Sequence, residues 1–149
     1  MMYQKILIAT DGSELAGRAV THGLKLAKEL NVPVVVVTVT RMWSALEIAH
    51  EARLTKANPI ESYQESAAAW AQRNLEPAGE QAKAAGVSFE LVHVPESAPA
   101  EGIIATAEKQ GCDLIVMASH GRRGLGRLLI GSQASEVLAY SKVPALIVR

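Results

Sequence analysis

Five short runs of aliphatic and β-branched residues recur along the chain, each bounded by turn-forming residues, as is typical of strands. The first, second, fourth and fifth runs show no alternation of apolar and polar positions. Their pattern indicates burial on both faces, as in a parallel sheet covered by helices. We therefore predict five strands, at Lys5–Ala9, Pro33–Val39, Val87–Val94, Asp113–Met117 and Ala145–Val148.

Helical patterns fill the gaps between these runs. Small and apolar residues after Ser13, a suitable N-cap, recur on one helical face. Glycines and a proline mark further helix ends, because glycine favours the C′ position and proline the first turn. We predict helices from Ser13 to near Asn31, over 62–85 with Gly86 at its end, from Ser97 through Pro99 to Gln110 with Gly111 at its end, and over Ser132–Tyr140.

Two stretches depart from this regularity. Pro77 falls inside the second predicted helix and should kink or divide it, since proline lacks an N–H and clashes with the preceding turn. The stretch 41–60 is too long for a loop and only weakly patterned, so we expect it to be helical with a mobile portion. Trp43 and Trp70 are expected to pack in this region rather than to cover a ligand.

Strands and helices alternate from one end of the chain to the other. Alternation with connections of this length predicts a parallel sheet with right-handed crossovers, an open doubly wound α/β fold with helices on both faces. The chain of 149 residues shows no internal repeat and no interdomain linker, so we expect a single domain over residues 1–149.

Composition narrows the possible partners. Fifteen basic side chains balance 15 acidic ones and no basic run occurs, which argues against nucleic acid and anionic membranes as partners. The single cysteine, Cys112, cannot form an intramolecular disulfide and is expected to be a core residue. Because the N-terminus shows no leader pattern and no apolar run approaches membrane-spanning length, a cytoplasmic protein is expected.

In open α/β sheets, ligands bind beyond the carboxyl ends of the strands, where the strand order reverses. Ala9, Thr10 and Asp11 follow the first strand, and the Asp11 carboxylate could accept a ribose hydroxyl or hold a divalent ion. An aspartate that merely begins a turn explains this feature equally well. Val39 ends the second strand, where its backbone could contact an adenine edge.

The segment Met117–Ser132 follows the fourth strand and is rich in glycine, with Gly121, Gly124, Gly126 and Gly131. Such a backbone can approach a phosphate closely, and Gly131 and Ser132 stand where a helix N-terminus presents unpaired N–H groups. Arg122, Arg123 and Arg127 add forked donors that suit phosphate oxygens, although arginines in loops are often only solvated. The spacing is neither that of a Walker A loop nor that of a dinucleotide fingerprint.

These motifs together resemble the universal stress proteins over essentially the whole chain. The resemblance is carried by IATDGS after the first strand, DLIVMASHG at the fourth, Gly131-Ser132 after nine further residues, and the terminal VPALIV. The ATP-binding branch of that family has Gly, two residues, Gly, nine residues and Gly-Ser or Gly-Thr. This chain matches at Gly121 and at Gly131-Ser132, but Ala118 occupies the first glycine position.

The resemblance implies a parallel sheet of order 3-2-1-4-5 and an adenine nucleotide site. By position, Asp11 would contact the ribose or Mg²⁺, the Val39 backbone would read adenine, and Met117 would pack near the base, with Ala9, Thr10 and Ala118 beside them. The phosphates would be surrounded by Gly121, Arg122, Gly131, Ser132 and Gln133. The ligand would be ATP, or else ADP or AMP. The resemblance, together with the sheet edge that this order exposes, also favours a homodimer through Val143–Arg149.

Rival functions fit less well. The chain lacks the phosphate-gripping signatures of adenylating enzymes and the aspartate and lysine that a phospho-acceptor receiver domain needs at its strand ends. No residue is placed to orient an attacking water, so any ATP hydrolysis should be slow. His22, His50 and His93 have no metal-ligand spacing to one another, and His120 is expected to be structural. Two functions remain: a nucleotide-binding regulator, or a member of the branch that does not bind ATP and acts as a protein-interaction module.

Overall fold

The computed structural model describes residues 2–54, 58–120 and 130–149. Strands and helices alternate as the sequence pattern predicts. Two consecutive helices separate the second and third strands, and the first of them lies within the stretch 41–60 that was expected to be helical. The elements are β1 (Ile6–Ala9), α1 (Glu14–Leu30), β2 (Val34–Val39), α2 (Ala45–Leu54), α3 (Pro59–Ala85), β3 (Phe89–Val94), α4 (Pro99–Gln110), β4 (Leu114–Ala118), α5 (Ser132–Tyr140) and β5 (Ala145–Val148).

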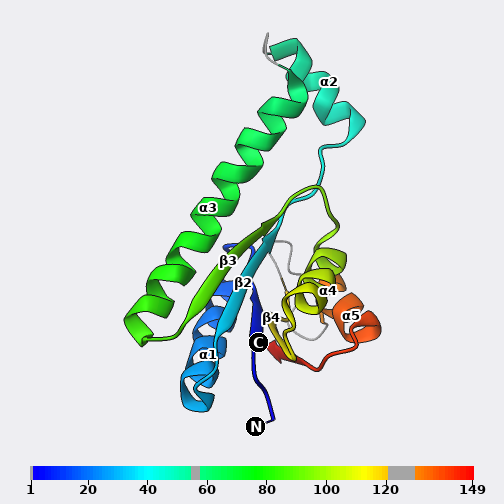
Figure 1. Cartoon of the computed structure of the whole chain (residues 1–149). Helices are drawn as coiled ribbons and strands as arrows, with labels where there is room; N and C mark the ends of the chain where they lie inside the picture. The colour runs from blue at the N-terminus through cyan, green and yellow to red at the C-terminus, as the bar shows by residue number, and fades with distance from the viewer. Residues whose placement is uncertain (1, 55–57, 121–129) are drawn as a thin grey trace.

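The strands form one parallel sheet in the order β3-β2-β1-β4-β5, which confirms the expected topology. Helices α1 and α3 cover one face of the sheet, and α4 and α5 cover the other (Figure 1). The predicted open doubly wound α/β fold is therefore correct. The order reverses between β1 and β4, so the chain segments that leave these two strands diverge from a shared edge.

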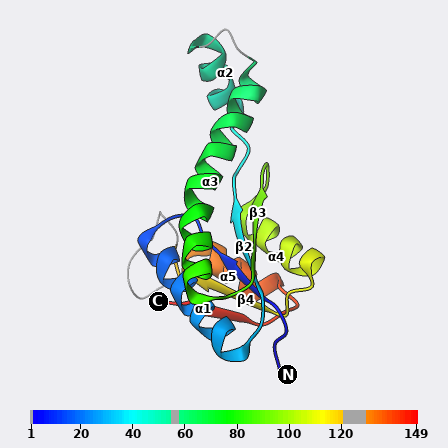
Figure 2. The same ribbon diagram turned by 60° about the vertical axis from the view of Figure 1, so that its left-hand side comes forward.

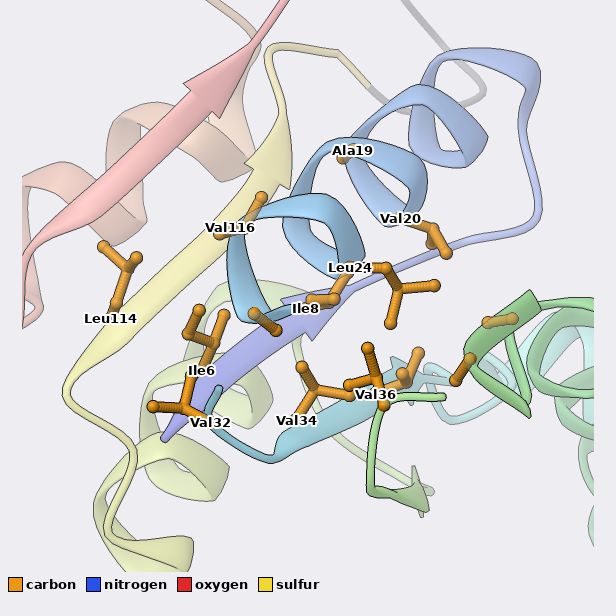
Figure 3. Packing of buried hydrophobic residues seen from close by; sticks show 14 of the residues in the cluster. Ile6, Ile8, Ala19, Val20, Leu24, Val32, Val34, Val36, Leu114 and Val116 are labelled. Carbon is orange, nitrogen blue, oxygen red and sulfur yellow. The ribbon is translucent and has the colours of Figure 1, made fainter. Parts of the chain in front are cut away.

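The three central strands supply most of the core. Ile6, Ile8, Val34 and Val36 pack with Val116 under α1, as Figure 3 shows, and the alternate residues of these strands pack under α4 and α5. Burial on both faces explains why these runs lack alternation. The edge strands differ, because every residue of β5 is only half-buried and β3 exposes two of its side chains.

The ends of α1 follow local rules. The Ser13 hydroxyl accepts a hydrogen bond from the Ala16 N–H at 3.2 Å, which makes Ser13 the N-cap as predicted. Asn31 ends the helix in the left-handed conformation, with φ of 56°, and its N–H donates to carbonyls of the last turn. Gly86 and Gly111 end α3 and α4 in the same conformation, as the sequence predicts.

Two helix predictions need correction. Of the two expected effects of Pro77, a kink or a division, the division does not occur: α3 continues from Pro59 to Ala85, and Leu75, Ala78 and Ala82 on either side of the proline are buried in the core. Ser97 is not the N-cap of α4. Ala98 occupies that position, and the Ser97 hydroxyl donates to the Ala98 carbonyl instead.

Helix α2 and the first part of α3 extend beyond the sheet as an arm (Figures 1 and 2). No residue of α2 is buried. The ring of Trp43, which precedes α2, packs edge-on against that of Tyr63 in α3, with centroids 5.4 Å apart, so Trp43 packs as expected. Within the described ranges, no helix combines the length and apolar character needed to cross a membrane.

Candidate functional site

The predicted site residues come from the carboxyl ends of β1, β2 and β4 and from the start of α5. Because β1 lies between β2 and β4, the segments after all three strands leave the same edge of the sheet. The sheet topology therefore brings together residues that are about 120 positions apart along the chain, from Thr10 to Ser132.

The turn after β1 is fixed by its own side chains. The buried Thr10 donates its N–H to the Val37 carbonyl at 2.9 Å, and its hydroxyl accepts from the Gly12 N–H at 3.2 Å. One Asp11 carboxylate oxygen accepts from the Ser13 N–H at 2.9 Å. Gly12 has a φ of 79°, a conformation that favours glycine. The Asp11 carboxylate is thus held in a defined place at the start of α1 and is only half-buried.

The Val39 backbone lies where the β1–β2 ladder has ended. The Thr40 N–H donates to Val94 and the Thr40 carbonyl accepts from Ser97, so both groups of Thr40 point towards β3. Successive residues of a strand alternate in direction, which turns the N–H and C=O of Val39 towards the β1 side. The last pair on that side is Ala9 with Val37.

Met117 and Ala118, at the end of β4, point to opposite faces of the sheet. Met117 is buried with residues of α4 and α5, whereas the Ala118 methyl is buried in the cluster under α1 and α3. The alanine that replaces the glycine of the resembled motif therefore directs its extra carbon into the core beneath α1.

The start of α5 is attached to the end of β4. The Gly131 N–H donates to the Ser119 carbonyl at 2.7 Å. A Cβ atom on Gly131 would lie 2.8 Å from that same oxygen, closer than protein atoms tolerate, so the approach requires glycine. Gly131 is the N-cap of α5 and has no side chain with which to cap the helix. The first N–H groups of α5 therefore receive no acceptor from the N-cap, and Ser132, the first helical residue, is exposed.

The side chain of Gln133 contacts the neighbouring helix α4. Its side-chain oxygen accepts a hydrogen bond from the Ala100 N–H in the first turn of α4, at 3.0 Å. This contact could not be predicted from the sequence, because the two residues are 33 positions apart and no local signal links them. The role of the Ser119 carbonyl was missed for a similar reason, since backbone acceptors carry no sequence signature.

Two of the predicted site residues, Gly121 and Arg122, lie outside the described residues, as do Arg123 and Arg127. Nearby, His120 accepts or donates a hydrogen bond at Nδ1 with the Ser119 hydroxyl, at 3.1 Å. The Nε2 atom of His120 is buried and has no hydrogen-bond partner among the described residues. The ring is thus held at the junction of β4 and α5.

Other candidate groups serve the core or the strand ends. Cys112 is buried as expected, and burial raises the pKa of its thiol to about 11, which makes it a poor nucleophile near neutral pH. His93 Nε2 lies 2.8 Å from the Thr40 hydroxyl, and burial lowers the His93 pKa. Across residues 2–54, 58–120 and 130–149, no three His, Cys, Asp or Glu side chains come together in a way that could hold a metal ion by themselves.

The chain is similar to known proteins over nearly its whole length. The model of the universal stress protein family matches residues 2–149. The universal stress protein MJ0531 of Methanocaldococcus jannaschii is 32% identical over 148 residues, which cover 99% of this chain and 83% of the relative. The universal stress protein YxiE of Bacillus subtilis is 30% identical over 158 residues, covering 99% and 100%.

Two solved structures superpose on this chain over nearly its whole length. The structure of MJ0577, also a protein of M. jannaschii, is 28% identical and superposes with a TM-score of 0.72 over 99% of this chain and 96% of that one. A universal stress protein in complex with cAMP is 26% identical and gives 0.69 over 100% and 98%. The chain described here therefore belongs to the universal stress protein family.

Proposed function

We propose that this protein is a regulator that binds an adenine nucleotide, ATP with Mg²⁺ or else ADP or AMP, at the edge of the sheet where β1 and β4 end. The observation that carries the proposal is the attachment of the α5 N-terminus to Ser119, directly after β4, the strand that pairs with β1, whose following turn holds Asp11. Unpaired backbone N–H groups and a nearby carboxylate are what phosphates and a ribose or bound cation require.

Each part of the nucleotide has candidate partners. The phosphates would approach the N–H groups of Ser132 and Gln133 and lie against Gly131, whose own N–H is bonded to Ser119, with Gly121 and Arg122 from the preceding segment. The adenine edge would meet the Val39 backbone groups, which point towards β1 beyond the last pair of the ladder. Ala9, Thr10, Met117 and Ala118 would support this arrangement from the strand ends.

The residues present fit Mg²⁺ only in the company of a nucleotide. Asp11 offers one carboxylate, and Mg²⁺ in nucleotide sites is commonly held by one or two carboxylates together with phosphate oxygens and water. A cation bound at Asp11 would neutralise phosphate charge, while this chain's own groups would bind and orient the ligand. The complex of a relative with cAMP supports an adenine nucleotide as the ligand class.

Isothermal titration calorimetry with MgATP, ADP, AMP and adenosine tests the proposal. We expect saturable binding of at least one nucleotide. Replacing Arg122 and Arg123 by Glu should weaken binding by ~1–3 kcal/mol, because charge-assisted contacts to phosphate would be lost. The matched control reverses two exposed cations of α1, Arg18→Glu with Lys25→Glu, and should leave affinity nearly unchanged.

Mass spectrometry of ligand released from protein purified without added nucleotide would identify the physiological species. The absence of binding to all four compounds, in protein with a native circular dichroism spectrum, would refute the proposal.

The second candidate function is that of a protein-interaction module which binds no ATP. The observation that favours it is the arm, where Leu46 and Leu54 of α2 are 83% and 67% exposed. Contiguous exposed apolar surface marks protein-interaction sites, and these two side chains of one helix would contribute to such a surface. The same calorimetry separates the two candidates, since only the first requires nucleotide binding.

A further inference from the structure

The first turn of α4 receives its hydrogen-bond acceptor from another helix. Its N-cap, Ala98, has a methyl side chain that cannot accept from the unpaired N–H groups of the turn. Gln133 supplies the acceptor, because its Oε1 lies 3.0 Å from the Ala100 nitrogen. Ala100 is only 2% exposed, so water cannot readily replace this partner. The Gln133 side chain therefore does for α4 what an N-cap residue does in most helices.

Gln133 itself belongs to the first turn of α5. It follows the N-cap Gly131 and the first helical residue, Ser132. Its own backbone N–H is consequently among the groups that a phosphate would approach at this helix terminus. One residue thus has its side chain on α4 and its backbone at the proposed phosphate end of the site.

A second bond holds the same turn from another direction. The Gly131 N–H donates to the Ser119 carbonyl at 2.7 Å, which joins α5 to the end of β4. The two bonds connect the start of α5 to two separate elements, and two attachments restrict the direction of the helix axis more than one does. The orientation of the α5 N–H groups is therefore set by contacts that lie outside α5.

We propose that Gln133 is a positioning residue for the nucleotide site: its side-chain bond to Ala100 orients the first turn of α5 so that the backbone N–H groups converge on the phosphates. This inference rests on the proposed function. It assigns the Gln133 side chain to the neighbouring helix and leaves only its backbone for the ligand.

The test variant is Gln133→Met, which keeps the length of the side chain and removes the acceptor. Loss of this cap should lower the thermal midpoint by about 2–4 °C. Affinity for ATP should fall by about three- to tenfold, the factor that corresponds to one net hydrogen bond. Affinity for adenosine should not change, because adenosine has no phosphate to meet α5. Gln64→Met, at an exposed position of α3, is the matched control and should change neither quantity.

A rescue variant separates positioning from stability. Ala98→Ser restores a neutral N-cap acceptor to α4 from its own chain segment. Added to Gln133→Met, it should recover the thermal midpoint but not the affinity for ATP, because α5 remains detached from α4. Recovery of both quantities would show that Gln133 acts only through the stability of α4 and would overturn the proposal, as would an unchanged ATP affinity in Gln133→Met.

Failure of the proposed function has a different result. In that case the wild-type protein binds none of the nucleotides, while Gln133→Met still lowers the thermal midpoint and Ala98→Ser still restores it. The cap would then be real, and no nucleotide would depend on it.

Discussion

Gly131 stands where two backbone segments meet, and the space for a side chain is filled by protein. Its φ of −61° is allowed for any residue, so the requirement for glycine comes from the Ser119 carbonyl, 2.8 Å from the position of a Cβ. Gly131→Ala should therefore lower the free energy of unfolding by ~1–3 kcal/mol, since a backbone atom must move to admit the methyl group. Urea denaturation followed by circular dichroism measures this change.

Gly17 provides the matched control for that experiment. It lies within α1, and a Cβ there would meet nothing within 4 Å. Gly17→Ala should raise stability by ~0.5–1 kcal/mol, because alanine is the better helix former. If Gly131→Ala were as stable as the wild type and lost only nucleotide binding, the space beside Gly131 would be needed by ligand rather than by protein.

His93 should make stability depend on pH. Burial lowers its pKa in the folded protein, while in the unfolded chain the value is about 6.5. Below pH 6.5 the unfolded chain therefore binds more protons than the folded one, and the free energy of unfolding should fall as the pH decreases towards the folded pKa. Denaturation midpoints measured at pH 7.5 and pH 5.0 should show a larger loss in the wild type than in His93→Gln.

The exposed His22 is the control for this prediction. His22→Gln should keep the full pH dependence of the wild type. An equal loss of stability in wild type and His93→Gln would assign the pH dependence to other groups.

At this scale, the sequence predicts what depends on neighbours along the chain. The Ser13 cap was predictable because donor and acceptor are three residues apart. The environment of Gln133 was not, because Ala100 reaches it only through the packing of α4 on α5. The orientation of the Ala118 methyl follows from strand alternation once the sheet is known, and no sequence pattern gives the faces beforehand.

The continuity of α3 through Pro77 is the main feature at the scale of elements. A proline inside a helix leaves the carbonyl four residues earlier, that of Arg73, without its usual donor. Both residues are exposed, so replacing the proline perturbs no packing. Pro77→Ala should raise the free energy of unfolding by ~1–3 kcal/mol, less any entropy that the proline removes from the unfolded chain.

Equilibrium denaturation in urea measures this gain. Gln72→Ala, at another exposed position of the same helix, should change stability by no more than ~0.5 kcal/mol. A Pro77→Ala protein less stable than the wild type would mean that α3 relies on the bend or the rigidity that proline gives.

The sequence predicts those helices and strands whose burial leaves a regular pattern of apolar residues. The buried strands β1, β2 and β4 were evident from uninterrupted apolar runs. The stretch 41–60 was unclear because α2 buries no residue, and a helix that packs so little carries no apolar stripe to detect. The run that became β5 resembles a central strand in composition but is an edge strand, which composition alone does not distinguish.

For the whole molecule, the outer edge of β5, with which no described strand pairs, is the expected dimer interface. Ile115 donates to the Pro144 carbonyl and Ser119 to the Val148 carbonyl, so alternate residues of β5 point their backbone groups towards β4. The groups of Ala145 and Ile147 consequently point outwards. We propose that Val143–Arg149 pairs with the same strand of a second copy around a twofold axis, which would cover an edge prone to aggregation.

Ile147→Pro tests this interface, because it removes an outward N–H and leaves the bonds to β4 intact. Sedimentation equilibrium should show about twice 15.9 kDa for the wild type and 15.9 kDa for a folded Ile147→Pro protein. Leu146→Pro should instead disturb the β4–β5 ladder and lower stability. A wild-type monomer at micromolar concentration would contradict the proposed dimer.

The order of the strands in the sheet could not be predicted from the hydrophobic pattern alone. Alternation of elements predicts a parallel sheet, but the order β3-β2-β1-β4-β5 was expected from the resemblance carried by IATDGS and Gly131-Ser132. Many orders satisfy the same apolar runs, because each buried strand can pair with any other. In the folded structure, the two edge strands differ from the central ones in exposure: β5 is half-buried throughout, and β3 has exposed residues.

The arm formed by α2 and the start of α3 has a consequence for motion. Opening α2 would expose little apolar surface, since none of its residues is buried, whereas opening β1 would expose residues that are wholly inaccessible. Amide hydrogens of α2 should therefore exchange with solvent through brief local unfolding, while those of β1 wait for the whole sheet to unfold. Hydrogen exchange would then report two free energies in one chain, a small one for the arm and a large one for the sheet.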